Sequence, residues 1–127
     1  MNTKILMTAS AFVMGMTAII LTFLPQEMII LSGHSVDYFN VLLIQILGAL
    51  YFAFAALNWM AKANLIGGIY SKPVAIGNFA HFFIGAITLL KNAFTQEVLI
   101  GLWIAAIVYS LFAVLFAKVA FGYPIKK

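Results

Sequence analysis

The chain has 127 residues and a mean hydropathy of +1.13, with 65% of its residues hydrophobic and only 8% charged. Water-soluble domains carry roughly 25% charged residues, so the composition excludes that class and predicts a single domain, residues 1–127, inside a lipid bilayer. The absence of cysteine excludes disulfides and cysteine-bound metals, and a net charge of +4 from scattered lysines, with no arginine, argues against nucleic-acid binding.

Four long stretches without charged residues predict the architecture. They contain 22, 24, 18 and 20 residues. At about 1.5 Å per residue they give roughly 27 to 36 Å of helix, which matches the roughly 30 Å hydrocarbon core of a bilayer. Helices are expected because a backbone in lipid must satisfy its own hydrogen bonds. We therefore predict an all-α integral membrane protein with transmembrane helices over residues 5–24, 38–61, 74–90 and 98–117.

The first stretch begins like a secretory signal, because Lys4 precedes an apolar run. A signal peptide has an apolar core of about 7 to 15 residues followed by a cleavage site with small residues. Here the apolar run continues to Leu24 and ends at Pro25. We therefore expect this helix to be retained.

The segment between the first two helices is predicted to be a partly apolar outer loop. Its middle, residues 28–31, is expected to lie along the membrane interface or to pack on the bundle. Ser32 and Gly33 predict a turn. Asp37 stands where a capping residue of the second helix is expected.

Local signals also mark the later helices. Gly67 and Gly68 predict a tight turn between the second and third helices. Pro73 suits the first turn of the third helix. Thr95 is predicted to cap the fourth helix, with Glu97 in its opening turn.

The lysines predict the orientation, because short cytoplasmic loops of membrane proteins are enriched in Lys and Arg. Six fall on one side of the predicted helices, namely Lys4, Lys62, Lys72, Lys118, Lys126 and Lys127. Lys91 falls on the other side with the three acidic residues. We expect a multi-pass, up-down bundle of the inner (plasma) membrane with both termini cytoplasmic. Trp59, Tyr70 and Tyr123 are expected to be aromatic anchors at the cytoplasmic interface.

The third predicted helix carries the most informative polar face. At 100° per residue, Asn78, His81, Gly85, Thr88 and Asn92 fall within an arc of about 80°. Polar side chains within a span usually face the bundle or a cavity. His81 is the only side chain in the four spans that titrates near neutral pH, and we expect its face to point inward.

The second and third helices run in opposite directions, so their residues can be matched by depth. Tyr51 falls level with His81, Asn58 falls level with Asn78, and Tyr51 shares a helix face with Asn58. We predict a polar seam between these two helices. Thr88 lies farther along the same face as His81.

The seam has a structural interpretation and two functional ones. Hydrogen bonds between membrane helices contribute about 0.6 kcal/mol each, which favours a non-enzymatic accessory or structural subunit. A small transporter or ligand-binding bundle that uses Tyr51, Asn58, Asn78 and His81 is the first alternative, and a lipid-modifying enzyme with His81 as acid or base is the second. Small residues at helical spacing predict close packing on three helices: Thr8, Ala11, Gly15, Ala18 and Thr22; Gln45, Ala49, Ala53 and Ala56; and Ala106, Ser110, Ala113 and Ala117.

No catalytic residue, metal site or cofactor is predicted. His34, the other histidine, is expected in the outer loop, separated from His81 by most of the membrane. Glu27, Asp37 and Glu97 are expected in outer loops, where carboxylates are usually solvated. The expected partners are membrane lipids and either a second copy of the chain or another membrane protein.

Overall fold

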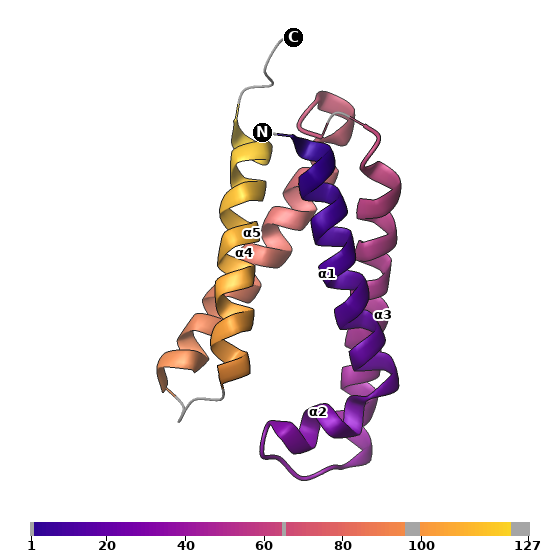
Figure 1. Cartoon of the computed structure of the whole chain (residues 1–127), viewed down its shortest axis with the longest axis vertical. Coiled ribbons are helices and arrows are strands. Elements are labelled where there is room, and N and C mark those ends of the chain that lie inside the picture. Colours follow the sequence, from indigo (N-terminus) through magenta and orange to yellow (C-terminus); the bar gives the residue numbers. More distant parts are fainter. Residues whose placement is uncertain (1, 65, 96–99, 123–127) are drawn as a thin grey trace. The chain divides into compact units, whose positions relative to one another are not determined.

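The computed structural model describes residues 2–64, 66–95 and 100–122, and all regular elements among them are helices (Figure 1). The elements are α1 (Thr3–Phe23), α2 (Pro25–Leu31), α3 (Tyr38–Ala61), the short 3-10 helix η1 (Ile69–Ser71), α4 (Lys72–Thr95) and α5 (Ile100–Phe121). Within this described part, four helices are long and apolar enough to cross a membrane: α1, α3, α4 together with η1, and α5. The all-α class and the four long apolar helices are therefore confirmed.

The observed helix ends follow the predicted ones closely, with two extensions. α3 has the predicted bounds, and α1 covers residues 3–23 instead of 5–24. α4 and α5 continue past the predicted ends at 90 and 117. The prediction ended each helix at a lysine, but a lysine near a helix end can extend its ammonium group to water while its backbone stays helical. The predicted start of the last helix at residue 98 lies outside the described residues.

The predicted cap of α3 is confirmed. The Oδ1 atom of Asp37 accepts the backbone N–H of Asn40 at 3.0 Å, and Oδ2 accepts the side-chain amide of the same residue. Pro73 lies in the first turn of α4, as predicted. Thr95 does not fit its predicted role, because it is the last residue of α4 and its hydroxyl donates to a carbonyl one turn earlier, at 3.0 Å. Glu97 lies outside the described residues.

The loop between α1 and α3 contains a short helix, α2, that was not predicted. Pro25 opens α2 with the fixed φ that suits a first helical position. Ile29 is buried, whereas Ile30 is exposed, so the apolar middle of the loop packs on the protein through one side. The predicted turn is confirmed: Gly33 has a φ of +78° and its N–H donates to the Ile30 carbonyl at 3.0 Å.

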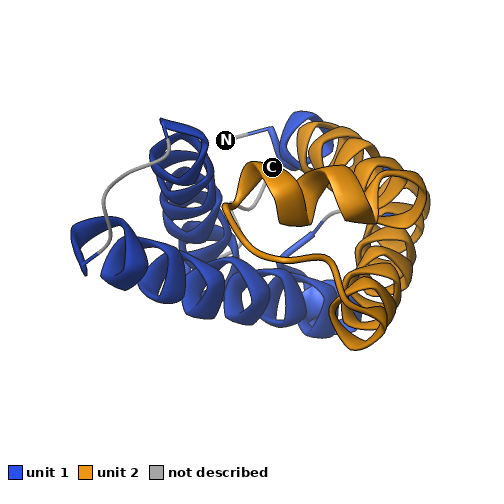
Figure 2. Cartoon of the chain, turned by 90° about the horizontal axis from the view of Figure 1, so that it is seen from below, with its two compact units in different colours: residues 1–6, 61–127 blue, residues 7–60 orange. Residues whose placement is uncertain are grey.

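The chain groups into two compact units, shown in Figure 2. Unit 1 comprises Met1–Leu6 and Ala61–Lys127, and unit 2 comprises Met7–Met60. Unit 1 therefore contains η1, α4 and α5, while unit 2 contains α2 and most of α1 and α3. The single domain over residues 1–127 stays a prediction.

In unit 2, α1 and α3 pack antiparallel through small residues. A Cβ atom built on Gly15 would lie 3.7 Å from the Cβ of Ala55, and one built on Gly48 would lie 2.5 Å from Oγ1 of Thr22. The two backbones therefore approach closely at both points. The small-residue stripe predicted on α1 is confirmed as a packing face.

The stripe predicted on α3 is wrong in part. Gln45 does reach α1, since its Nε2 donates to the Thr22 carbonyl at 3.4 Å, but Ala49 and Ala53 are exposed. The buried residues of α3 are Gly48, Ala55 and Asn58. The prediction failed because faces that meet lipid and faces that meet another helix are both apolar in a membrane protein.

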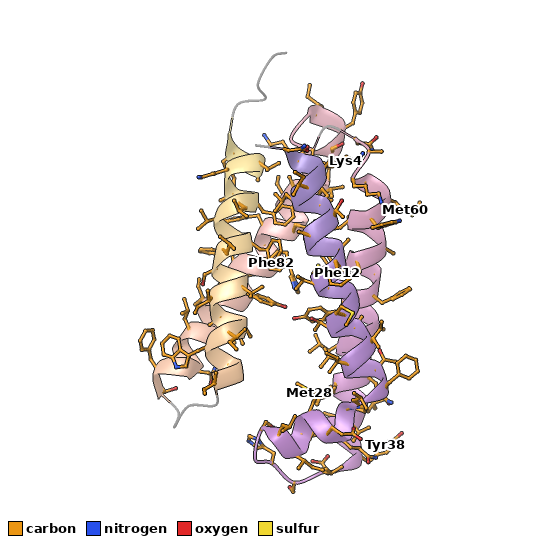
Figure 3. All side chains as sticks on the ribbon, in the orientation of Figure 1. Lys4, Phe12, Met28, Tyr38, Met60 and Phe82 are labelled. Atoms are coloured by element: carbon orange, nitrogen blue, oxygen red, sulfur yellow. The ribbon has the colours of Figure 1, made fainter. Side chains whose placement is uncertain are left out.

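In unit 1, α4 and α5 pack antiparallel around aromatic rings. Phe82, labelled in Figure 3, is fully buried, and its ring stacks on Phe112 and Phe116 with centroids 4.8 and 5.7 Å apart. Ala106 and Ala113, from the predicted stripe on α5, are also buried. That stripe is therefore confirmed at these two positions.

The connection from α3 to α4 makes the tight turn that its glycines predict. Gly67 has a φ of +109°, which side-chain-bearing residues rarely adopt. The N–H of Ser71 donates to the Gly68 carbonyl at 3.0 Å and closes η1. Lys72 then begins α4 without a break.

Candidate polar site

His81 and Tyr109 form a polar pair between α4 and α5. Nε2 of His81 lies 3.2 Å from the hydroxyl oxygen of Tyr109, within hydrogen-bond distance. Both residues are half-buried, and the Phe82 ring lies beside each, with centroid distances of 5.0 and 5.1 Å. A neutral imidazole and a phenol each have one donor and an acceptor. The pair can therefore share one hydrogen bond, in either direction, between Nε2 of His81 and the Tyr109 hydroxyl.

Gly85 provides the space in which the Tyr109 ring lies. A Cβ atom at this position would lie 2.5 and 2.6 Å from two ring carbons of Tyr109, closer than real Cβ contacts. Gly85 follows His81 by one helical turn, so the two residues share a face of α4. A tyrosine ring over Gly85 therefore brings its hydroxyl to His81.

We expect Gly85→Ala to displace the Tyr109 ring and separate it from His81. The free energy of unfolding should fall by about 1 to 3 kcal/mol, the usual cost of overpacking. Tyr109→Phe removes only the hydroxyl and should cost about 0.6 kcal/mol. Unfolding in mixed micelles with increasing sodium dodecyl sulfate measures the free energies, and the imidazole NMR signals of His81 should shift in both variants.

Gly101→Ala is the matched control, because a Cβ atom there would meet no described residue within 4 Å apart from its chain neighbours and the nearby backbone of its own helix. It should leave the His81 signals unchanged. Equal stability of Gly85→Ala and Gly101→Ala would contradict the close approach of Tyr109 to α4.

Asn58 forms a second polar link, in unit 2. It is fully buried, and its Nδ2 donates to the Ser10 hydroxyl at 3.0 Å and lies 3.8 Å from the sulfur of Met14. The Ser10 hydroxyl donates in turn to the Met7 carbonyl at 3.0 Å. This chain of hydrogen bonds connects a side chain of α3 to the backbone of α1.

The other residues of the predicted seam lie as follows. Tyr51 is half-buried on α3, and Asn78 is fully buried on α4. Asn78 and the exposed Thr88 donate to backbone carbonyls one turn earlier, at 3.0 and 2.9 Å. Tyr51 and Asn58 belong to unit 2, whereas Asn78, His81 and Thr88 belong to unit 1. The pairing of Tyr51 with His81 and of Asn58 with Asn78 stays a prediction.

Two polar partners, Tyr109 and Ser10, were missed by the sequence reasoning. Counting back from the predicted end at residue 117 places Tyr109 about 12 Å deep, against about 10 Å for His81. That match in depth could have identified the pair. Ser10 directly precedes Ala11, a member of the predicted packing stripe, and a hydroxyl beside such a stripe is a candidate for bonding a facing helix.

The second histidine lies away from this site along the chain. Nδ1 of His34 is 3.1 Å from the Ser32 hydroxyl, in the turn after α2. Among residues 2–64, 66–95 and 100–122, no three His, Asp or Glu side chains are grouped so that they could hold a metal ion.

Comparison of the chain with models of known protein families, with curated proteins and with solved structures found no match.

Proposed function

We propose that the chain is a multi-pass protein of the inner (plasma) membrane and acts as a non-enzymatic accessory or structural subunit. It is embedded among lipids and assembles with a second copy or with another membrane protein. The helices form an up-down bundle with both termini in the cytoplasm.

The observation that carries this proposal is the use of polar groups to join helices. Among the described residues, every buried side-chain nitrogen or oxygen has a hydrogen-bond partner. Asn58 joins α3 to α1 through Ser10, and His81 joins α4 to α5 through Tyr109. Bonds of this kind fix how helices pack in a membrane, which supports a structural role.

The apolar surface supports contacts with lipid and with a membrane partner. α3 buries few of its residues within the chain, and its large exposed side chains include Leu43, Ile46, Leu50, Phe52 and Met60. Large exposed apolar side chains in such number are typical of a surface that meets lipid or a partner. Lipid tails or the helices of another subunit would cover it.

The lysines support the orientation. Lys72 and Lys91 lie near opposite ends of α4, and Lys118 lies in the last turn of α5, at the end where α4 begins. Six of the seven lysines fall on this side of the predicted spans. Short cytoplasmic loops are enriched in Lys and Arg, so this side is proposed to be the cytoplasmic one.

A small transporter or ligand-binding bundle is the second candidate. Its support is the half-buried state of His81 and Tyr51, which leaves part of each polar side chain accessible within an apolar span. Polar groups at such depths often mark a substrate path. The site would comprise Tyr51, Asn58, Asn78 and His81.

His81→Ala and Asn58→Ala separate the two candidates. With a structural role, each variant should lower the unfolding free energy by about 0.6 to 2 kcal/mol and the Tm by several degrees. Thr88→Ala is the control, because its hydroxyl is exposed and bonds its own helix; it should melt like the wild type. Thermal unfolding of detergent-purified protein measures all three.

The opposite result favours the transporter. If His81→Ala and Asn58→Ala melt at the wild-type temperature, while a candidate substrate raises the Tm of the wild type and not of these variants, the structural role is contradicted.

A further inference from the structure

Unit 1 presents two large apolar side chains on the turn between α3 and α4. Ile69 is 88% exposed and Tyr70 is 98% exposed. They are adjacent in η1. Exposed apolar groups of this size, next to the end of a membrane span, are typical of contact with the lipid interface.

The turn holds these side chains outward because its base is packed on α5. Ile66 is buried at 4% exposure, and a Cβ atom on Gly67 would lie 3.1 Å from the Val119 carbonyl oxygen. The hydrogen bond from Ser71 to Gly68 closes the turn. The exposure of Ile69 and Tyr70 therefore follows from a packed turn.

Two lysines adjoin this turn or the residue on which it packs. Lys72 directly follows η1, and Lys118 directly precedes Val119, the residue of α5 against which Gly67 packs. Both lysines are exposed. Lys62 begins the connection and is half-buried. The sequence has no acidic residue between positions 38 and 96, nor after position 97, so the local charge is positive.

We propose that Ile69, Tyr70, Lys72 and Lys118 form a binding surface for an anionic phospholipid. The inference rests on the membrane location proposed above and names the lipid class that this end of unit 1 recognises. The ammonium groups pair with the phosphate and the acidic head group, Tyr70 lies at head-group level, and Ile69 contacts the start of the acyl chains. The surface adjoins the start of α4, so it lies at the depth where head groups occur.

Native mass spectrometry of the full chain in detergent, with added phosphatidylglycerol or phosphatidylcholine, tests the proposal. The wild type should retain phosphatidylglycerol in preference to phosphatidylcholine. A lysine near an anionic surface contributes about 1 kcal/mol, or about fivefold in affinity. The double variant Lys72→Gln/Lys118→Gln should therefore bind phosphatidylglycerol about 25-fold more weakly.

Lys91→Gln is the matched control, because Lys91 is exposed near the opposite end of α4. It should bind phosphatidylglycerol within about twofold of the wild type, since opposite ends of a span lie far beyond a Debye length of about 8 Å. Ile69→Ser should weaken lipid binding about fivefold without changing charge. Inorganic phosphate at millimolar concentration should not displace the lipid.

Three outcomes would overturn the proposal. The first is an equal loss of phosphatidylglycerol affinity in Lys91→Gln and in the double variant. The second is equal retention of the two lipids by the wild type. The third is displacement of phosphatidylglycerol by inorganic phosphate, which would identify a site for free anions. Extraction of membranes with alkaline carbonate tests the location separately. If the wild type is released, the membrane location fails; if it stays while the lysine variants bind lipid normally, only the lipid surface fails.

Discussion

Gly48→Val should destabilise the pairing of α1 and α3 by about 2 to 3 kcal/mol. Even a Cβ atom at this position would lie 3.1 Å from the backbone nitrogen of Thr22 and 3.3 Å from the carbonyl oxygen of Ala18. The Thr22 hydroxyl can rotate away, but these backbone atoms move only if the helices separate. Overpacking of this kind costs about 1 to 3 kcal/mol. Unfolding in mixed micelles with increasing sodium dodecyl sulfate measures the loss.

Gly48→Ala and Gly15→Ala form a matched pair on the same interface. A Cβ atom at Gly15 meets Ala55 at 3.7 Å, an ordinary contact, so Gly15→Ala should be neutral or gain up to about 1 kcal/mol from helix propensity. Gly48→Ala should be destabilising despite the same gain. If the two variants have the same stability, the close approach of α1 and α3 at Gly48 is contradicted.

Phe82→Ala should destabilise the pairing of α4 and α5 by about 3 kcal/mol. The residue is fully buried, and its ring contacts Phe112, Phe116 and Tyr109 with centroids 4.8, 5.7 and 5.1 Å away. Truncation of a buried phenylalanine leaves a cavity whose walls lose their contacts. The same detergent titration measures this loss.

Phe83→Ala is the control for Phe82→Ala. Phe83 is 45% exposed and follows Phe82 on the same helix, so both variants change helix propensity and composition equally. Phe83→Ala should cost under about 1 kcal/mol, because its ring has fewer protein contacts to lose. If Phe82→Ala and Phe83→Ala lower the free energy of unfolding equally, the face of α4 that contacts α5 is not the one that carries Phe82.

The spans were predictable because charge marks the boundary between lipid and water. Each of the four uncharged stretches overlaps one of the helices α1, α3, α4 and α5 in the described residues, although α4 and α5 continue past the lysines at which the stretches end. Asp37 was also predictable, because a side-chain acceptor before an apolar run satisfies backbone N–H groups that have no partner in the helix. α2 was missed because seven residues give too little periodicity to distinguish a short helix from an apolar loop.

The packing faces were predicted less well, for a physical reason. In a soluble protein the buried face is apolar and the outer face polar, but in lipid both are apolar. The stripe through Ala49 and Ala53 therefore had the same composition as a packing face, although both residues are exposed. The polar partner Tyr109 was missed because the partners of His81 were sought on the second predicted helix, whereas Tyr109 reaches His81 from α5.

The most direct test of a four-span membrane protein is the labelling of single cysteines in spheroplasts. The chain has no cysteine of its own, so Ser35→Cys and Ala63→Cys each introduce one thiol at an exposed position of a connecting segment. A membrane-impermeant maleimide should label Ser35→Cys in intact spheroplasts and Ala63→Cys only after permeabilisation. Equal labelling of both variants in intact spheroplasts would contradict this arrangement, as would recovery of the protein from the soluble fraction.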